Sequence, residues 1–173
     1  MNILIFNFFF SLSSNALIAW SSLFISNILI YVFIIVAVMI PIIISRDYIY
    51  AIITAGAGGA AWVFAYIMKA IILVPRPFVT LHLTPLYMET SSSFPSSHVI
   101  LTMTLTILVW KLNRKLGIVF LIFTILTAFS RMIIGVHYPT DLLAGACFGL
   151  IFGLCAIWFN KFIRGLSIFK KYI

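Results

Sequence analysis

The chain has 173 residues and a formal net charge of +8, with 64% hydrophobic and only 8% charged residues. A soluble domain needs more charge than this on its exterior, so the composition excludes a soluble globular protein and indicates a membrane protein. The excess of basic residues does not indicate nucleic-acid binding, because these residues lie in short segments between apolar runs.

Apolar runs of about 20 residues, long enough to cross a hydrocarbon core of roughly 30 Å, recur along the chain. Residues 1–19 are rich in Phe and Ile but interrupted by Asn and Ser, and we predict a helix lying in the membrane interface. Five spans follow, and we expect them at residues 20–44, 48–73, 96–111, 116–134 and 139–159. Residues 74–95 form a loop, because Pro75 and Pro77 end the second span. The sequence therefore predicts an all-α fold, a single polytopic membrane bundle of six helices over residues 1–173.

Small residues gather on two of the expected spans. Gly145, Gly149 and Gly153 recur every four residues, which predicts a tight helix crossing. Residues 55–61 offer a second small-residue face for close helix contact. Both patterns favour packing within the bundle over a chemical role.

Five spans bring the basic turns and tail to one side of the membrane, namely Arg46, Lys111, Arg114, Lys115, Lys161, Arg164, Lys170 and Lys171. By the positive-inside rule that side is cytoplasmic, and the carboxyl end lies there too. The loop 74–95 and the turn around His137 then lie together on the opposite face. We therefore expect a multi-pass protein of the inner (cytoplasmic) membrane, with any site formed by these segments facing outward.

Lys69 and Arg76 are the first charged residues that an ordinary bundle does not need. Seven residues are about two helical turns, so both side chains can point to one face of the helix end. Two cations without a carboxylate near them in sequence repel one another, and an anion such as phosphate relieves that repulsion. Snorkelling of both side chains to the membrane interface is the alternative explanation.

The segment Phe94-Pro95-Ser96-Ser97-His98 begins the third expected span. Serine caps helices, and the unpaired N–H groups of a helix start bind phosphate. His98 lies in the first turn, where its imidazole can donate a proton to a leaving oxygen. An ordinary capped helix with an incidental histidine would have the same sequence.

The third cluster is Ser130-Arg131 followed by His137-Tyr138-Pro139-Thr140-Asp141. Pro139 suits the first turn of a helix, which puts His137 just before the fifth span and Asp141 one turn inside it. The carboxylate can accept the proton of one imidazole nitrogen and leave the other free to attack. A His–Asp hydrogen bond that only ties a loop to a helix is the alternative. The three clusters are expected on one membrane face, which favours a shared site.

Together the clusters resemble the three-part motif of the type 2 phosphatidic acid phosphatase superfamily, K-x6-R-P, P-S-G-H and S-R-x5-H-x3-D. Residues 69–77 and 130–141 match the first and third parts. Residues 95–98 match the second part, except that Ser97 stands where glycine is usual. Serine is compatible with a helix cap, so we expect activity to survive; a many-fold gain in Ser97→Gly would mean that the pocket geometry is suboptimal.

The resemblance implies a role for each matched residue. His137 would take the phosphoryl group as a phosphohistidine, and Asp141 would orient the imidazole and stabilise its charge. His98 would protonate the leaving lipid oxygen and later help to activate water. The phosphate oxygens would be held, together with local backbone N–H groups, by Lys69, Arg76, Ser96, Ser97 and Arg131. Phosphoryl transfer needs mainly positioning and charge neutralisation, which agrees with these roles.

No cofactor is expected. The acidic residues are only Asp47, Glu89 and Asp141, too few for a carboxylate metal site, so we predict catalysis without a metal. His82 and Glu89 fall in the outer loop, where we expect solvated side chains; contact with a substrate head group is the alternative. The expected partners are a membrane lipid phosphate and the bilayer, with no nucleic acid and no obligate protein partner.

The sequence thus predicts a lipid phosphatase. We favour undecaprenyl diphosphate as its substrate by a narrow margin, because residues 135–139 and 75–78 resemble the polyprenyl enzymes. Phosphatidylglycerophosphate phosphatase and lipid A 1-phosphatase are the alternatives within the family. A membrane protein that binds an anion without turnover is the alternative of another class. A vanadate-dependent haloperoxidase shares the motif, but those enzymes are soluble.

Overall fold

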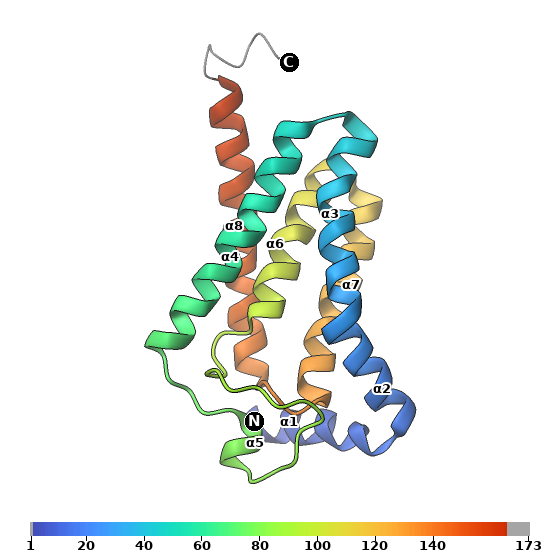
Figure 1. Cartoon of the computed structure of the whole chain (residues 1–173), viewed down its shortest axis with the longest axis vertical. Helices are drawn as coiled ribbons and strands as arrows, with labels where there is room; N and C mark the ends of the chain where they lie inside the picture. Colours follow the sequence, from blue (N-terminus) through green and yellow to red (C-terminus); the bar gives the residue numbers. More distant parts are fainter. Residues whose placement is uncertain (1, 166–173) are drawn as a thin grey trace.

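The computed structural model describes residues 2–165, and the regular elements of this part of the chain are helical (Figure 1). They are α1 (Asn2–Ser11), α2 (Ala16–Phe24), α3 (Ile30–Ser45), α4 (Tyr48–Ile71), α5 (Pro77–Thr80), α6 (Ser97–Leu112), α7 (Arg114–Ile133) and α8 (Pro139–Gly165), with a 3-10 turn η1 (Leu12–Ser14) and a π-helical turn η2 (Ile25–Leu29). The predicted all-α fold is confirmed. The single-turn helix α5, inside the expected loop, was not predicted. Met1, Lys170 and Lys171 lie outside the described residues.

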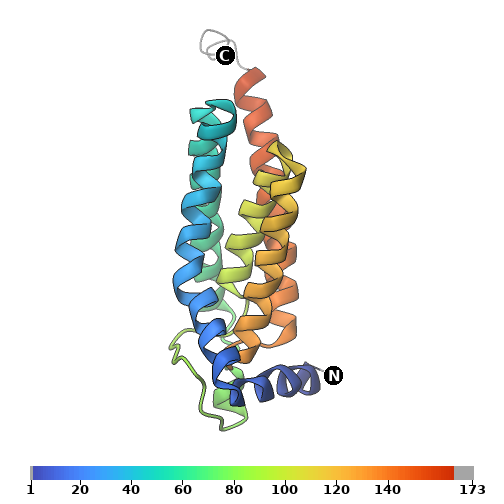
Figure 2. The same ribbon diagram turned by 90° about the vertical axis from the view of Figure 1, so that its right-hand side faces the viewer.

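Among residues 2–165, four continuous helices are long and apolar enough to cross a membrane: Ala16–Ser45, which joins α2, η2 and α3, and then α4, α7 and α8. The helix α6 has only 16 residues, or about 24 Å, which is less than the hydrocarbon thickness. It packs against α3, α4, α7 and α8 in the middle of the bundle (Figures 1 and 2). The third of the five expected spans is therefore a shorter, enclosed helix.

Polar side chains set where the long helices begin. Asn15, Asp47 and Asn113 accept hydrogen bonds from backbone N–H groups in the first turns of α2, α4 and α7. Each satisfies donors that have no partner within the helix. The first span consequently starts at Ala16 and not at residue 20, because Asn15 is a helix cap and not an interruption within an interfacial helix.

The helix α1 lies across one end of the bundle, where it packs against α7 and α8 (Figure 2). Phe9 stacks on Phe129 of α7, with ring centroids 4.8 Å apart. Asn2 donates to the hydroxyl of Thr140 and accepts from its backbone N–H, at the start of α8. The single helix predicted for residues 1–19 is thus divided: α1 covers the bundle end, and the residues after Asn15 belong to the first long helix.

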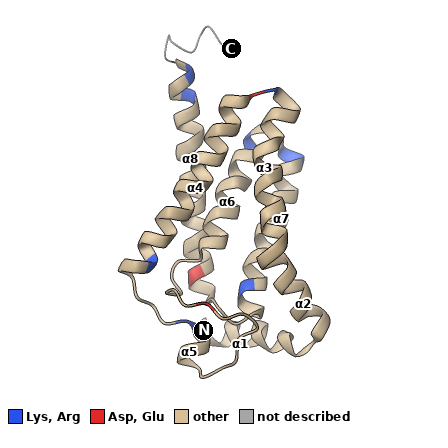
Figure 3. Cartoon of the chain, viewed as in Figure 1, with Lys and Arg blue, Asp and Glu red and all other residues tan. Residues whose placement is uncertain are grey.

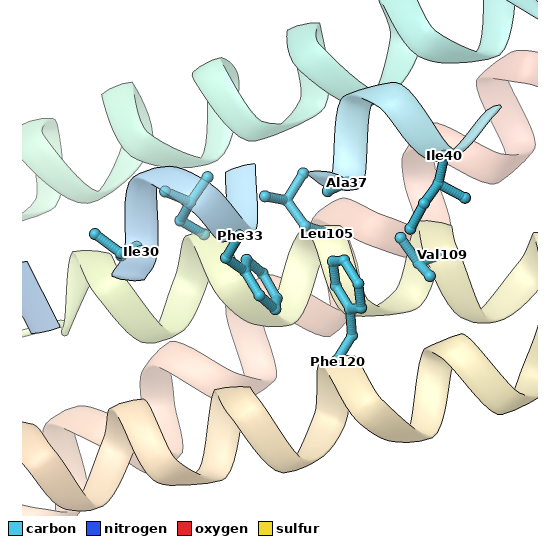
Figure 4. Packing of buried hydrophobic residues seen from close by; sticks show 8 residues of the cluster. Ile30, Phe33, Ala37, Ile40, Leu105, Val109 and Phe120 are labelled. Atoms are coloured by element: carbon cyan, nitrogen blue, oxygen red, sulfur yellow. The ribbon is translucent and has the colours of Figure 1, made fainter. Parts of the chain in front are cut away.

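The largest apolar cluster lies between α3, α6 and α7 (Figure 4). Phe33 of α3 contacts Phe120 of α7, with ring centroids 4.3 Å apart. The other members of the cluster are Ile30, Ala37, Ile40, Leu101, Leu105 and Val109. These side chains hold α3 against α6 and α7.

The helices α6 and α8 cross closely because three glycines line the contact. A Cβ atom at Gly149 would lie 2.6 Å from the carbonyl oxygen of Ile100, and one at Gly153 would lie 2.6 Å from Cβ of Ile107. Neither position has room for a side chain. The tight crossing predicted from Gly145, Gly149 and Gly153 is confirmed.

The small residues of α4 are only partly a packing face, which corrects the prediction for residues 55–61. A Cβ atom at Gly58 would approach Leu101 of α6 to 3.2 Å. At Gly56 and Gly59 it would meet nothing within 4 Å among residues 2–165. The small side chains here leave space beside α4, and Gly58 and Gly59 line a cavity.

Candidate functional site

Charged residues lie toward the two ends of the bundle (Figure 3). The residues of the three sequence motifs meet at the end covered by α1 and by the loop between α5 and α6. A cavity of about 990 Å³ begins here and runs between α3 and α4. Its polar end is lined by Lys69, Glu89, Ser97, His98 and His137, and its apolar wall includes Ile30, Ile34, Val38, Trp62, Leu101 and Leu105.

His137 precedes α8, and its imidazole is held against Asp141 in the first turn of that helix. Nδ1 of His137 lies 3.4 Å from Oδ2 of Asp141, and both side chains are buried. The same oxygen accepts from the backbone N–H of Tyr138 at 2.8 Å and from Oγ of Ser93 at 2.5 Å. The carboxylate is therefore fixed, and it faces the Nδ1 side of the ring.

The turn that carries His137 depends on Gly135. Its φ of +89° lies in a region that side-chain-bearing residues rarely adopt, and a Cβ atom would lie 2.9 Å from Cε2 of Phe10 in α1. The carbonyl oxygen of Val136, the next residue, accepts from Nη1 of Arg76 at 2.9 Å. The turn is thus held from both sides.

Burial lowers the pKa of His137 well below its ordinary value, and the charges of Arg131, Arg76 and Lys69 act in the same direction. The imidazole is therefore neutral at pH 7. A neutral ring with Nδ1 directed at a carboxylate keeps a lone pair on Nε2, which suits it to attack an electrophile.

Lys69 and Arg76 bind the backbone of the loop that precedes α6. Nζ of Lys69 donates to the carbonyl oxygens of Ser92 and Ser93, at 2.6 and 3.2 Å. Nε of Arg76 donates to the carbonyl oxygen of Ser91 at 2.7 Å. Irregular backbone inside a membrane bundle needs such donors. Both side chains are less than 7% exposed, so the snorkelling alternative is wrong.

Arg131, at the end of α7, is fully buried and incompletely paired. Its Nη2 donates to Oε1 of Glu89, whereas its Nε and Nη1 have no hydrogen-bond partner among the residues that the structure describes. The buried hydroxyl of Ser96 has none there either. Unpartnered buried donors cost free energy, and a bound oxyanion would satisfy them.

Glu89 is not a solvated loop residue, and that prediction is wrong. Its Oε2 lies 2.6 Å from Nη2 of Arg76, and its Oε1 pairs with Arg131. Burial alone would raise the pKa of Glu89, but the guanidinium groups of Arg131 and Arg76 lower it below its ordinary value. The carboxylate is therefore ionised. His82, in the same loop, is exposed as expected.

His98 lies in the first turn of α6 and lines the cavity together with His137. Its ring meets Trp62 of α4 edge-on, with centroids 5.7 Å apart. Ser96 is the N-cap residue of α6, and its backbone N–H donates to the carbonyl oxygen of Asp141 at 3.2 Å. This bond ties the start of α6 to the start of α8.

The predicted site residues therefore gather at one place but play unequal parts in its surface. Lys69, Ser97, His98 and His137 line the cavity directly. Asp141 does not line the cavity but pairs with His137, which does. Arg76 and Arg131 do not line it either, and both pair with Glu89, which does. Within residues 2–165, no group of three His, Cys, Asp or Glu side chains could hold a metal ion.

Two polar partners of the site were missed in the sequence. Ser93 donates to Asp141, and Ser26 of η2 shares a hydrogen bond of 2.6 Å with Ser130, the residue before Arg131. Both hydroxyls are buried. Ser26 lies among several polar residues at the start of a mostly apolar span, in the π-helical turn η2, which contacts α7.

Residues 45–164 match the family model of the PAP2 superfamily. Undecaprenyl-diphosphatase BcrC of Bacillus subtilis (strain 168) is 36% identical over 121 residues. The alignment covers 69% of this chain and 61% of that relative, so the chain spans less than two thirds of the relative's length.

Two solved structures share the fold. The transmembrane PAP2-type phosphatidylglycerolphosphate phosphatase from Bacillus subtilis superposes with a TM-score of 0.68 at 19% identity, over 88% of this chain and 79% of that one. LpxE of Aquifex aeolicus gives a TM-score of 0.73 at 19% identity, over 91% and 94% of the two chains. Together with the long apolar helices, these matches identify a multi-pass membrane protein.

Proposed function

This chain belongs to the PAP2 superfamily, and from that premise we propose that it is a membrane phosphatase that releases phosphate from a lipid phosphate or diphosphate. The cavity is the observation that carries the proposal. Its polar end holds two imidazoles, a lysine and the carboxylate of Glu89, and its remaining wall is largely apolar. A phosphorylated lipid has the same division into a charged head group and a hydrocarbon chain. The chain of the lipid would lie between α3 and α4, beside Gly59.

His137 is the nucleophile of the proposed reaction. Asp141 holds the proton on Nδ1, so the Nε2 lone pair attacks phosphorus and the bond from phosphorus to the leaving oxygen breaks. His98 gives its proton to that oxygen, which leaves as a lipid alcohol, or as a lipid monophosphate when the substrate is a diphosphate. His98 then takes a proton from water, the hydroxide attacks the phosphohistidine, and inorganic phosphate leaves with His137 restored.

The cations neutralise the charge of the transferred group. Arg131 has two buried donor groups without protein partners, and Lys69 lines the cavity beside the histidines. With Arg76, Ser96 and Ser97 they would hold the phosphate oxygens. We propose that no metal is needed. Activity that disappears in a chelator and returns with Mg²⁺ would overturn this part.

Undecaprenyl diphosphate is the substrate that we favour. The 36% identical relative bears that activity in its name, although the alignment covers 61% of its length. Phosphatidylglycerophosphate is the first alternative, because an enzyme named for it has the same fold. Lipid A 1-phosphate is the second. All three substrates combine a phosphate group with hydrocarbon chains and suit the cavity in the same way.

We further propose that the site faces outward from the inner membrane. The described basic residues at the opposite end of the bundle, Arg46, Lys111, Arg114, Lys115, Lys161 and Arg164, would be cytoplasmic by the positive-inside rule. The carboxyl end would be cytoplasmic as well.

The test is phosphate release by the purified full chain in detergent, offered the three lipids above and phosphatidic acid. We expect release from at least one of them and its loss in His137→Ala. His82→Ala is the matched control, because this histidine is exposed in the loop at the same end of the bundle. A substrate labelled with ³²P should leave an acid-labile label on the wild type and none on His137→Ala.

The possible outcomes separate the hypotheses. Release from no substrate, with phosphate still bound, would favour a non-catalytic anion-binding protein. Equal release from wild type and His137→Ala would exclude His137 as the nucleophile.

A further inference from the structure

Glu89 occupies the position between the two arginines that the proposed reaction assigns to phosphate. Its two carboxylate oxygens accept one hydrogen bond each, Oε2 from Arg76 and Oε1 from Arg131. Two oxygens of a phosphoryl group would bind the same two guanidinium groups in the same way. Glu89 also lines the cavity next to His98 and His137.

We propose that Glu89 is a resident competitor of the phosphate group, which must leave the arginine pair before phosphate binds and which returns as phosphate departs. The inference rests on the proposed function, since it assigns the phosphate to the Arg76–Arg131 pair. The two anions exclude one another, because like charges in a buried place repel strongly.

The arrangement of donors permits this exchange. Arg76 keeps its bonds to the carbonyl oxygens of Ser91, Ser92 and Val136 when Glu89 leaves, so its guanidinium stays in position. Arg131 binds Glu89 through Nη2 alone and keeps Nε and Nη1 unpartnered within the described part of the chain. A pair that served only to stabilise the fold would be expected to use the whole fork of a buried arginine.

The residues on either side of Glu89 are exposed, which leaves room for its side chain to move. Tyr87 and Met88, the two residues before it, are 45% and 71% exposed, and Thr90 after it is exposed as well. Ser91 to Ser93, in contrast, are held by Lys69 and Arg76. Glu89 therefore lies on a short exposed stretch between two anchored points, the bond from the Leu86 N–H to the carbonyl oxygen of Ile134 and the bonds to Ser91–Ser93, so its side chain can swing without moving the start of α6.

Phosphate can bind only to molecules in which Glu89 has left the arginines. The apparent affinity for every phosphate ligand is therefore reduced in proportion to the fraction of molecules in which the arginines are free. It also helps inorganic phosphate to leave after hydrolysis, because Glu89 takes its place. Removing the charge should therefore tighten phosphate binding and strengthen product inhibition. A purely structural salt bridge predicts the opposite, a disturbed site with weaker binding.

The experiment compares the wild-type full chain with Glu89→Gln by isothermal titration calorimetry with inorganic phosphate in detergent. Glutamine keeps the size and one acceptor oxygen but lacks the charge. We expect the Kd for phosphate to fall about tenfold or more. Glu89→Asp keeps the charge on a side chain too short to join both arginines, and it should give an intermediate Kd. Asp47→Asn, which removes an equal charge at the other end of the bundle, should leave the Kd unchanged.

The possible results distinguish a carboxylate that competes with phosphate from a structural salt bridge. An unchanged or higher Kd in folded Glu89→Gln, with the wild type binding phosphate, would overturn the role of Glu89 and leave the proposed function standing. If Glu89→Gln does not fold, a Kd for Glu89→Asp at or above that of the wild type would overturn it. A lower Kd in Asp47→Asn would mean that the change in net charge, and not the removal of Glu89 from the arginines, explains the tighter binding of phosphate. No phosphate binding by any variant would overturn the anion site together with the inference.

Discussion

Each end of the bundle holds an acidic residue paired with arginine, but the two pairs differ in burial and in partners. At the basic end, Oδ2 of Asp47 lies 2.5 Å from Nη2 of Arg164, and the side chains are 22% and 26% exposed. The other oxygen of Asp47 caps α4. At the site end, Glu89 meets two buried arginines, and one of these has donors without a partner among the described residues.

The difference is the one expected between a structural pair and the pair that we propose to be functional. A partly exposed pair is screened by water and contributes little, but all its groups are satisfied. Buried charges cost free energy unless they are fully paired, so the incomplete pairing of Arg131 does not optimise stability. Local arrangements that work against stability are expected at functional sites. The comparison can be tested by making matched changes at the two ends.

The largest effect is expected from replacing one arginine at each end. Arg131→Gln removes a charge that would stabilise the transferred phosphoryl group, so kcat/KM for lipid-phosphate hydrolysis should fall about 10²- to 10³-fold. Arg164→Gln should leave kcat/KM unchanged. Phosphate release by both purified variants, with thermal unfolding to verify folding, measures the difference. Equal losses of kcat/KM in the two variants would mean that both arginines affect activity only by stabilising the fold.

Two glycines of α8 allow the two ends of the bundle to be compared by changes in helix packing. A Cβ atom at Gly145 would lie 3.0 Å from the carbonyl oxygen of Ser96, so Gly145→Ala should shift the start of α6 and lower activity about tenfold. At Gly153 the Cβ atom would lie 2.6 Å from Cβ of Ile107, away from the site. Gly153→Ala should cost about 1–3 kcal/mol of stability while activity per folded molecule stays unchanged.

The measurements are phosphate release and the free energy of unfolding of both alanine variants in the same detergent. Activity lost in proportion to stability in both variants would contradict a special role for the crossing near Ser96. A Gly145→Ala variant with full activity would mean that α6 tolerates a shift at its first turn.

The sequence predicted the parts of the fold and site that depend on local order. The all-α membrane bundle was predicted from apolar runs and from the prolines that end helices. The α6–α8 crossing was predicted from the four-residue spacing of glycines. These patterns can be recognised within short stretches of sequence. The motif residues lie at the ends of the expected spans. The chain crosses the membrane an even number of times between one motif and the next, which predicted that all three motifs lie on the same membrane face. Their chemical roles remain predictions that the proposed experiments test.

The parts that could not be predicted depend on contacts between distant residues. Glu89 is 13 residues from Arg76 and 42 from Arg131, and Ser93 is 48 from Asp141. No periodicity relates such positions, and a loop glutamate is usually solvated. The start of the first span was missed for a different reason, because an Asn between apolar residues either interrupts a helix or caps it.

The smallest effect is expected at the basic end, where two substitutions of Asp47 separate its two contacts. Asp47→Asn keeps the oxygen that caps α4 and loses the ion pair, so the free energy of unfolding should fall by only about 0.5 kcal/mol, and by less at high salt. Asp47→Ala loses the cap as well and should cost about 1 kcal/mol more at any salt concentration. Denaturant titrations of both variants at two ionic strengths measure these terms. Lower phosphate release by the folded Asn variant would mean that the two ends are coupled, and the division between a structural and a functional pair would fail.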